Sequence, residues 1–121
     1  MRDDDNLIGR VRQSAPGCYT ERDGGDWYII GPGETRLAEG FAIRRSAHEC
    51  LLWLAGDPVG AGFVIERRSD LFCEVKSRRN GEYATVWTKE AMRAFPASRN
   101  LLGEADQAIP GAADVGRAPA I

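Results

Sequence analysis

The sequence has few of the residues that catalysis and metal binding use. Its 121 residues contain one histidine, His48, and three cysteines, Cys18, Cys50 and Cys73, that lie far apart and form no Cys-x-x-Cys motif. Zinc sites usually show closely spaced Cys and His ligands, so no metal or other cofactor is expected. No Gly-x-Ser-x-Gly motif is present, and a serine triad would have to use His48. An enzyme with a site near His48 is therefore the least favoured hypothesis.

Long apolar runs and the features of a secretory leader are absent as well. No apolar run approaches the ~18–20 residues that a membrane-spanning helix needs. The chain opens with the acidic stretch Met1–Asn6 rather than with basic and apolar residues. An odd number of cysteines in such a chain is typical of reduced, buried thiols. We therefore expect a cytoplasmic protein that makes no contact with membranes.

Lysine is scarce, because only Lys76 and Lys89 accompany the arginines among the 16 basic residues. The formal net charge is −2 and the isoelectric point is near 5.4, which argues against a surface built as a whole to hold nucleic acid. A net charge of −2 is nevertheless compatible with a local basic patch, since basic residues slightly outnumber acidic ones over residues 27–95. The preference for arginine favours bidentate and stacked contacts, and it equally fits a GC-rich bacterial or mobile-element genome.

What is present predicts an α+β fold, in which a mostly antiparallel sheet packs against one main helix and one short helix. We expect a flexible acidic N-terminus over residues 1–9, a single domain over 10–95, and a disordered tail rich in Ala, Gly and Pro over 96–121. Residues 7–18 fit either a helix or a strand. Asp26–Ile30 is predicted as a strand that forms a hairpin with a second strand within Arg36–Ile43.

The main helix is predicted over residues 47–55. Ser46 precedes it and Glu49 follows three residues later, which is the pattern of a capping box. Gly56 and Pro58 end the helix. Residues spaced three or four apart form one apolar stripe: Ala47, Cys50, Leu51 and Leu54.

The same helix separates the residues that could have formed a reactive pair. His48 and Cys50 stand about 200° apart around its axis, so they cannot share a metal ion or act as base and nucleophile. The short helix is predicted over residues 89–95, with Thr88 as its cap and Ala91, Met92 and Phe95 facing inward.

Three strands are predicted as a meander between the two helices, over residues 63–68, 71–77 and 82–88. Asn80-Gly81 predicts a two-residue type I′ turn that pairs Lys76 with Thr85. A three-residue loop over Arg68–Asp70 places Phe63 and Ile65 on the core face. The other residues expected on that face are Leu71, Cys73, Val75, Ala84 and Val86.

The opposite face of the meander, with the tip of its second hairpin, is the predicted binding surface. It mixes aromatic and basic side chains: Arg68, Phe72, Lys76, Arg78, Arg79, Tyr83 and Trp87. Such a mixture is typical of protein interfaces, where Trp, Tyr and Arg act as anchors. It is also used for stacking bases and holding phosphates. A third reading is that a terminal segment covers this face and makes it part of the core.

The favoured hypothesis is a small non-enzymatic protein that acts by protein–protein binding through this face. The alternative is a nucleic-acid-binding regulatory protein that uses the same residues. A homodimer also fits the sequence, because Leu52 and Trp53 fall at or beyond the margin of the main helix's apolar stripe. The segment Trp27–Ala55 is loosely similar to the arm-type DNA-binding domains of phage integrases, but the similarity rests on common patterns and assigns no family.

Overall fold

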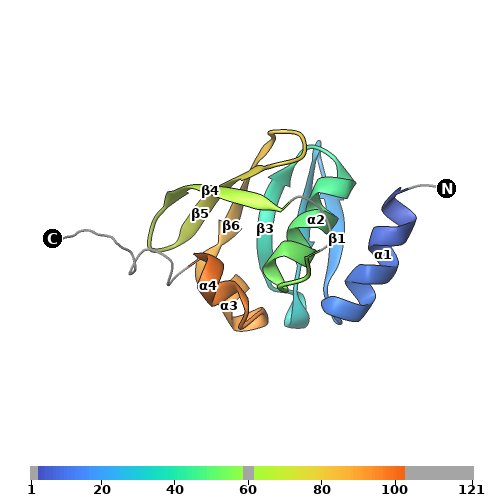
Figure 1. Ribbon diagram of the computed structural model, residues 1–121, viewed down its shortest axis with the longest axis horizontal. Helices are drawn as coiled ribbons and strands as arrows, with labels where there is room; N and C mark the ends of the chain where they lie inside the picture. Colours follow the sequence, from blue (N-terminus) through green and yellow to red (C-terminus); the bar gives the residue numbers. More distant parts are fainter. Residues whose placement is uncertain (1–2, 59–61, 103–121) are drawn as a thin grey trace, which may run out of the picture.

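The computed structural model describes residues 3–58 and 62–102, and it has the α+β class predicted from the sequence (Figure 1). The elements follow in the order α1 (Asp3–Ser14), β1 (Tyr19–Asp23), β2 (Asp26–Ile30), the 3-10 turn η1 (Pro32–Glu34), β3 (Arg36–Phe41), α2 (Arg44–Leu54), β4 (Phe63–Arg68), β5 (Phe72–Ser77), β6 (Tyr83–Trp87), α3 (Thr88–Ala94) and α4 (Ser98–Leu102). The strands form one antiparallel six-stranded sheet in the order β1-β2-β3-β6-β5-β4.

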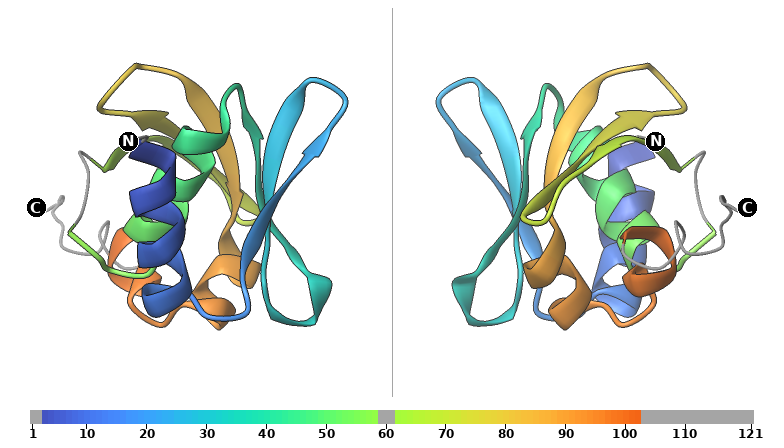
Figure 2. Two further views of the ribbon diagram at one scale, coloured as in Figure 1. Left: turned by 90° about the vertical axis from the view of Figure 1, so that its right-hand side faces the viewer. Right: turned by 90° about the vertical axis from the view of Figure 1, so that its left-hand side faces the viewer.

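The helices gather on one side of this curved sheet (Figure 2). α2 packs against β1, β2 and β3, α3 packs against β3, β5 and β6, and α1 packs on α2. We call the side that carries the helices the inner face and the opposite side the outer face. Because the described terminal helices lie on the inner side, no described element covers the outer face.

The core lies between the helices and the inner face. The predicted inward residues of the meander are buried at Cys73, Val75, Ala84 and Val86, which confirms the alternation read from the sequence. Leu71 is an exception, because it precedes β5 and is 63% exposed. The inward residues of the short helix, Ala91 and Phe95, are buried, and Met92 packs against the core.

Both ends of the packed part extend beyond the predicted range of 10–95. Residues 3–9, expected to be flexible, form the first part of α1, and Leu7 and Val11 on one face of that helix are buried. At the other end, α4 buries Leu102 within the core, and residues 103–121 lie outside the described residues.

A polar contact fixes α1 to the end of α2. Arg10 donates from Nε to Asp57 Oδ2 at 2.7 Å and from Nη2 to Oδ1 at 3.2 Å, and Ser14 Oγ donates to Oδ2 of the same carboxylate at 2.5 Å. The carboxylate of Asp57 raises the pKa of the Arg10 guanidinium, first through the hydrogen bond and then through its charge. α1 also packs on α2 and contributes Leu7 and Val11 to the core. Leu52, at the margin of the apolar stripe predicted for α2, is fully buried in the same core.

The predicted capping box at the start of the main helix is wrong. α2 begins at Arg44, three residues earlier than expected, and its N-cap residue, Ile43, makes no side-chain cap bond. Ser46 and Glu49 therefore lie inside the helix, and their side chains bind the loop between β5 and β6 instead. Thr88, predicted as the cap of the short helix, is also inside its helix, where its hydroxyl lies 3.6 Å from Cys73 Sγ.

The turn between β5 and β6, closed by the pair Ser77 and Glu82, has four residues rather than the predicted two. Ser77 donates its amide to Glu82 O at 2.8 Å, and Lys76 pairs with Tyr83 rather than with Thr85. Gly81 takes a positive φ of 80°, while Asn80 uses its side-chain oxygen to accept the amide of Glu82. The shift amounts to two residues, so every side chain keeps the predicted face although its partner changes.

Candidate functional site

The outer face carries a continuous row of polar side chains across all six strands. Paired positions run from β1 to β4 in the order Glu21, Tyr28, Glu39, Thr85, Glu74 and Arg67. Neighbouring strands lie ~4.8 Å apart, so the glutamates on alternate strands repeat at ~10 Å. The row therefore presents regularly spaced carboxylates on an open sheet.

Aromatic rings flank this row on β5 and β6. Trp87 and Phe72 pair across the two strands with ring centroids 5.9 Å apart in an edge-to-face arrangement, and Trp87 Nε1 donates to Glu39 Oε1 at 3.3 Å. Tyr83, which is 52% exposed, lies beside Lys76, whose ammonium is 5.8 Å from the ring centre. The structure thus brings together four of the predicted site residues: Phe72, Lys76, Tyr83 and Trp87.

Tyr28 extends the aromatic surface onto the first hairpin, and sequence reasoning missed it. Its ring lies under the Arg36 guanidinium at 3.9 Å, and its hydroxyl donates to Glu21 Oε1 at 2.8 Å. That hydrogen bond to a carboxylate raises the pKa of Tyr28. The sequence feature that could have revealed this surface is the turn Asp23–Asp26. A turn directly before a strand implies that a partner strand precedes the turn in the sequence.

Carboxylates outnumber basic groups on the outer face. The acidic side chains placed there by strand pairing are Glu21, Asp23, Asp26, Glu39 and Glu74, against the basic Arg36, Arg67 and Lys76. Asp23 and Asp26 lie directly opposite each other at the tip of the first hairpin, where like charges repel. A hollow of ≈ 210 Å³ opens beside them, lined by Asp23, Asp26, Trp27, Tyr28, Arg36, Glu39 and Gly40.

Arg68, predicted on the same face, points the other way. A β-bulge between Ile65 and Arg67 inserts one extra residue, so Arg68 pairs with Cys73 on the core side. Its guanidinium donates to the carbonyl oxygens of Leu101 and Leu102 at the end of α4. Arg68 is therefore a structural residue of the inner side.

The two arginines that follow β5, Arg78 and Arg79, also have different environments. Arg79 turns toward α2, where its Nε donates to Glu49 Oε2 at 2.8 Å and its Nη2 donates to Ser46 Oγ at 3.2 Å. Glu49 is 4% exposed and also accepts from Arg45 Nε at 3.1 Å. Arg78 is exposed directly after β5, where its amide donates to Gly62 O at 3.0 Å. The hairpin tip is thus anchored to the main helix by one of its two predicted contact residues.

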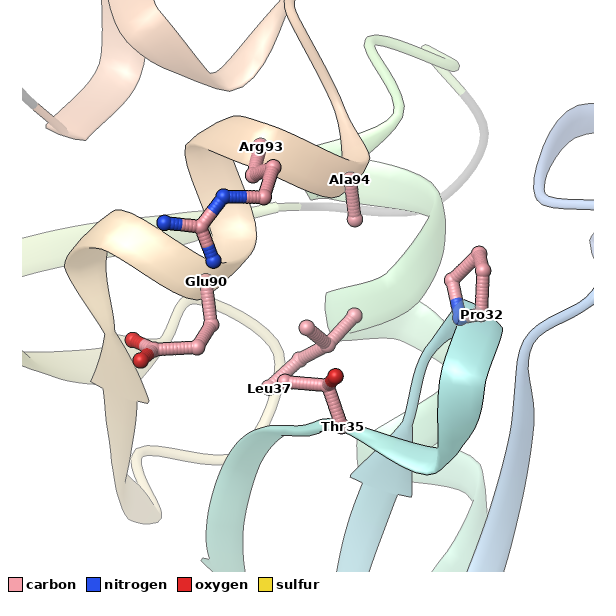
Figure 3. A pocket seen from close by; sticks show the side chains of 6 residues that line it. All are labelled: Pro32, Thr35, Leu37, Glu90, Arg93 and Ala94. Carbon is pink, nitrogen blue, oxygen red and sulfur yellow. The ribbon is translucent and has the colours of Figure 1, made fainter.

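The first cleft beside the sheet lies between η1 and α3 and has a volume of ≈ 250 Å³. Figure 3 shows Glu90 and Arg93 on the α3 side, Pro32 and Thr35 opposite them, and Leu37 between the two sides. One acid and one base stand at its rim, and Thr35 adds a hydroxyl group to its lining.

A second cleft brings His48 together with a cysteine from another segment, as an enzyme would require. It lies between α1, β1 and the start of α2, and both Cys18 and His48 line it. Burial raises the pKa of the Cys18 thiol, which keeps it in the unreactive protonated form. His48 Nε2 lies 3.1 Å from Thr20 Oγ1. Among the described residues no group of three or more His, Cys, Asp and Glu side chains is placed to hold a metal ion.

Within residues 3–58 and 62–102, no helix has the length and apolar character needed to cross a membrane.

Comparison with other proteins does not add a functional assignment. No protein-family model, curated protein sequence or solved structure matches the chain.

Proposed function

We propose that this chain is a non-enzymatic binding protein whose outer sheet face docks a protein partner with a basic contact surface. The observation that carries the proposal is the outer face, which no described element covers and on which a row of regularly spaced carboxylates lies beside aromatic rings. Monomeric proteins usually cover large aromatic surfaces, so such a face favours an interaction role.

The aromatic rings supply the anchoring part of the interface. Trp and Tyr dominate binding energy in protein interfaces because they bury large areas at little cost in side-chain entropy. Trp87 is held in place by Glu39 and Phe72, and Tyr28 is held by Glu21 and Arg36. Rings fixed before binding lose little freedom on binding, which favours their role as anchors.

The excess of carboxylates selects the kind of partner. The repulsion between Asp23 and Asp26 is relieved when a cation approaches, and the hollow beside them has room for one lysine or arginine side chain. Complementary charge also speeds association and disfavours acidic partners. The proposed partner therefore presents lysines or arginines around an apolar centre.

Nucleic acid, the alternative partner, is less well supported. Of the three arginines expected to contact phosphate, Arg68 binds α4 and Arg79 binds Glu49, which leaves Arg78 as the exposed one. Affinity for nucleic acid depends mainly on neutralised phosphates. A face with more carboxylates than cations repels that backbone.

Site-specific photo-cross-linking tests the proposal. A photoreactive phenylalanine analogue at Tyr83 probes the outer face, and the same analogue at Gln13, exposed on α1, serves as the matched control. In host cells we expect Tyr83, and not Gln13, to capture one defined protein, whose binding after purification is weakened by Trp87→Ala. Equal capture from both positions, or capture of nucleic acid, would overturn the proposal.

A further inference from the structure

We propose that the second cleft, between α1, β1 and the start of α2, binds a small organic anion. Its volume is ≈ 190 Å³, and it is lined by Ile8, Val11, Arg12, Cys18, Tyr19, Thr20, Arg44 and His48. This cleft lies on the inner side of the sheet, away from the outer face, and it is independent of the proposed protein docking.

The charge of the lining defines the ligand class. Arg12 and Arg44 come from different helices and both line this cleft, where the Arg44 guanidinium also lies 5.6 Å from the centre of the Trp27 ring. None of the described residues that line the cleft is acidic. Guanidinium pairs carboxylate and phosphate oxygens in a planar, bidentate geometry.

The polar floor of the cleft can add hydrogen bonds to an anion. His48 is 4% exposed, and its Nε2 lies 3.1 Å from Thr20 Oγ1. When Nε2 carries the proton, it donates to Thr20 Oγ1, and the hydroxyl hydrogen of Thr20 can then point to a ligand. Arg44 is the first residue of α2, so the positive end of that helix dipole also lies at this cleft.

The remaining wall and the size restrict the body of the ligand. Ile8 and Val11 supply an apolar side. Pockets for drug-sized ligands usually measure about 300–1,000 Å³, so ≈ 190 Å³ suits a smaller molecule. The ligand class is therefore a carboxylate or phosphate monoester attached to one ring or a short alkyl group.

Titration with benzoate, phenyl phosphate, phenol and inorganic phosphate, followed by NMR of the full chain, tests the inference. We expect both organic anions to shift the signals of Thr20 and His48, phenol and inorganic phosphate to bind at least about tenfold more weakly, and the tighter of the two anions to identify the preferred oxyanion. Binding of phenol as tight as that of the anions, or no binding of either anion at millimolar concentration, would overturn it.

Matched variants locate the site. Arg12→Gln with Arg44→Gln should weaken benzoate and phenyl phosphate by about tenfold or more, the effect of losing a charge-assisted hydrogen bond. Arg93→Gln with Arg99→Gln removes the same charge from α3 and α4 and should leave binding unchanged. Thr20→Val removes the hydroxyl group at the floor of the cleft without altering the charge. It tests the hydrogen bond from this hydroxyl to the ligand and should also weaken binding. Equal loss in both double variants, or undiminished binding in Thr20→Val and the first double variant, would contradict the assignment.

Discussion

Glu49 on α2 and Arg79 in the β5–β6 loop form an ion pair in which Nε lies 2.9 Å from Oε1 and 2.8 Å from Oε2. The Glu49 side chain is 4% exposed and that of Arg79 is 27% exposed, so the pair is largely shielded from water. It connects the hairpin to the main helix across thirty residues of sequence.

Arg79→Ala should lower the free energy of unfolding by about 1–3 kcal/mol, because it leaves a buried carboxylate with Arg45 as its described cationic partner. Arg78→Ala, in the same loop but exposed, should change it by less than about 0.5 kcal/mol. Urea unfolding measures both values. Equal effects would mean that the Glu49–Arg79 contact does not stabilise the fold.

The N-terminal helix provides a second prediction. Val11→Ala should destabilise by about 1–3 kcal/mol because it removes buried methyl groups. Gly9→Ala should stabilise by about 0.5–1 kcal/mol, since Gly9 lies within α1 and an added Cβ meets no neighbour within 4 Å. Thermal unfolding distinguishes this helix from a flexible tail, for which neither substitution would shift the midpoint.

The acidic opening, Asp3–Asn6, shows why the sequence predicted a flexible start and left residues 7–18 open between helix and strand. Charge runs and a missing apolar start indicate a solvated tail, and the pair Leu7 and Val11 is too short a pattern to predict a helix alone. Burial against α2 decides the outcome, and α2 is distant in sequence. The helix is an effect of tertiary packing rather than of local preference.

Arg68 and Arg67 are neighbours with opposite roles. Arg68→Ala should destabilise by about 1–3 kcal/mol, since its guanidinium holds the carbonyl oxygens at the end of α4. Arg67, whose side chain is 64% exposed and pairs with Glu74 at 3.6 Å, should tolerate alanine within about 0.5 kcal/mol. Chemical denaturation compares the free energies of unfolding of the two alanine variants. A larger loss of stability for Arg67→Ala than for Arg68→Ala would show that the bulge assignment is wrong.

The bulges mark the limit of the sequence-based register. Strict alternation predicted the core face of β5 and β6 correctly, because those strands are regular. In β4 one extra residue, Glu66, reverses the direction of Arg68, and in β3 a register shift next to Gly40, whose φ is 93°, turns Phe41 into the core. A bulge has no clear local pattern in a single sequence, so its consequences for the site could not be foreseen.

Indifference to nucleic acid is a fourth prediction. Light scattering of the full chain with short single-stranded DNA and RNA, at about 50 mM salt where phosphate contacts are strongest, should show no gain in mass. The physical reason is the excess of carboxylates around Tyr28 and Glu39. A mass gain that Tyr83→Ala removes would establish the nucleic-acid alternative instead.

The central claim, that the acidic outer face binds a basic protein surface, is tested most directly by the dissociation constant of the partner captured from Tyr83. Glu74→Lys reverses a charge on β5 of the outer face and should weaken binding by about tenfold or more, with a smaller effect at high salt. Lys89→Glu, an exposed reversal on α3, should leave the constant unchanged. Unchanged binding in Glu74→Lys, or equal loss in both variants, would contradict the account.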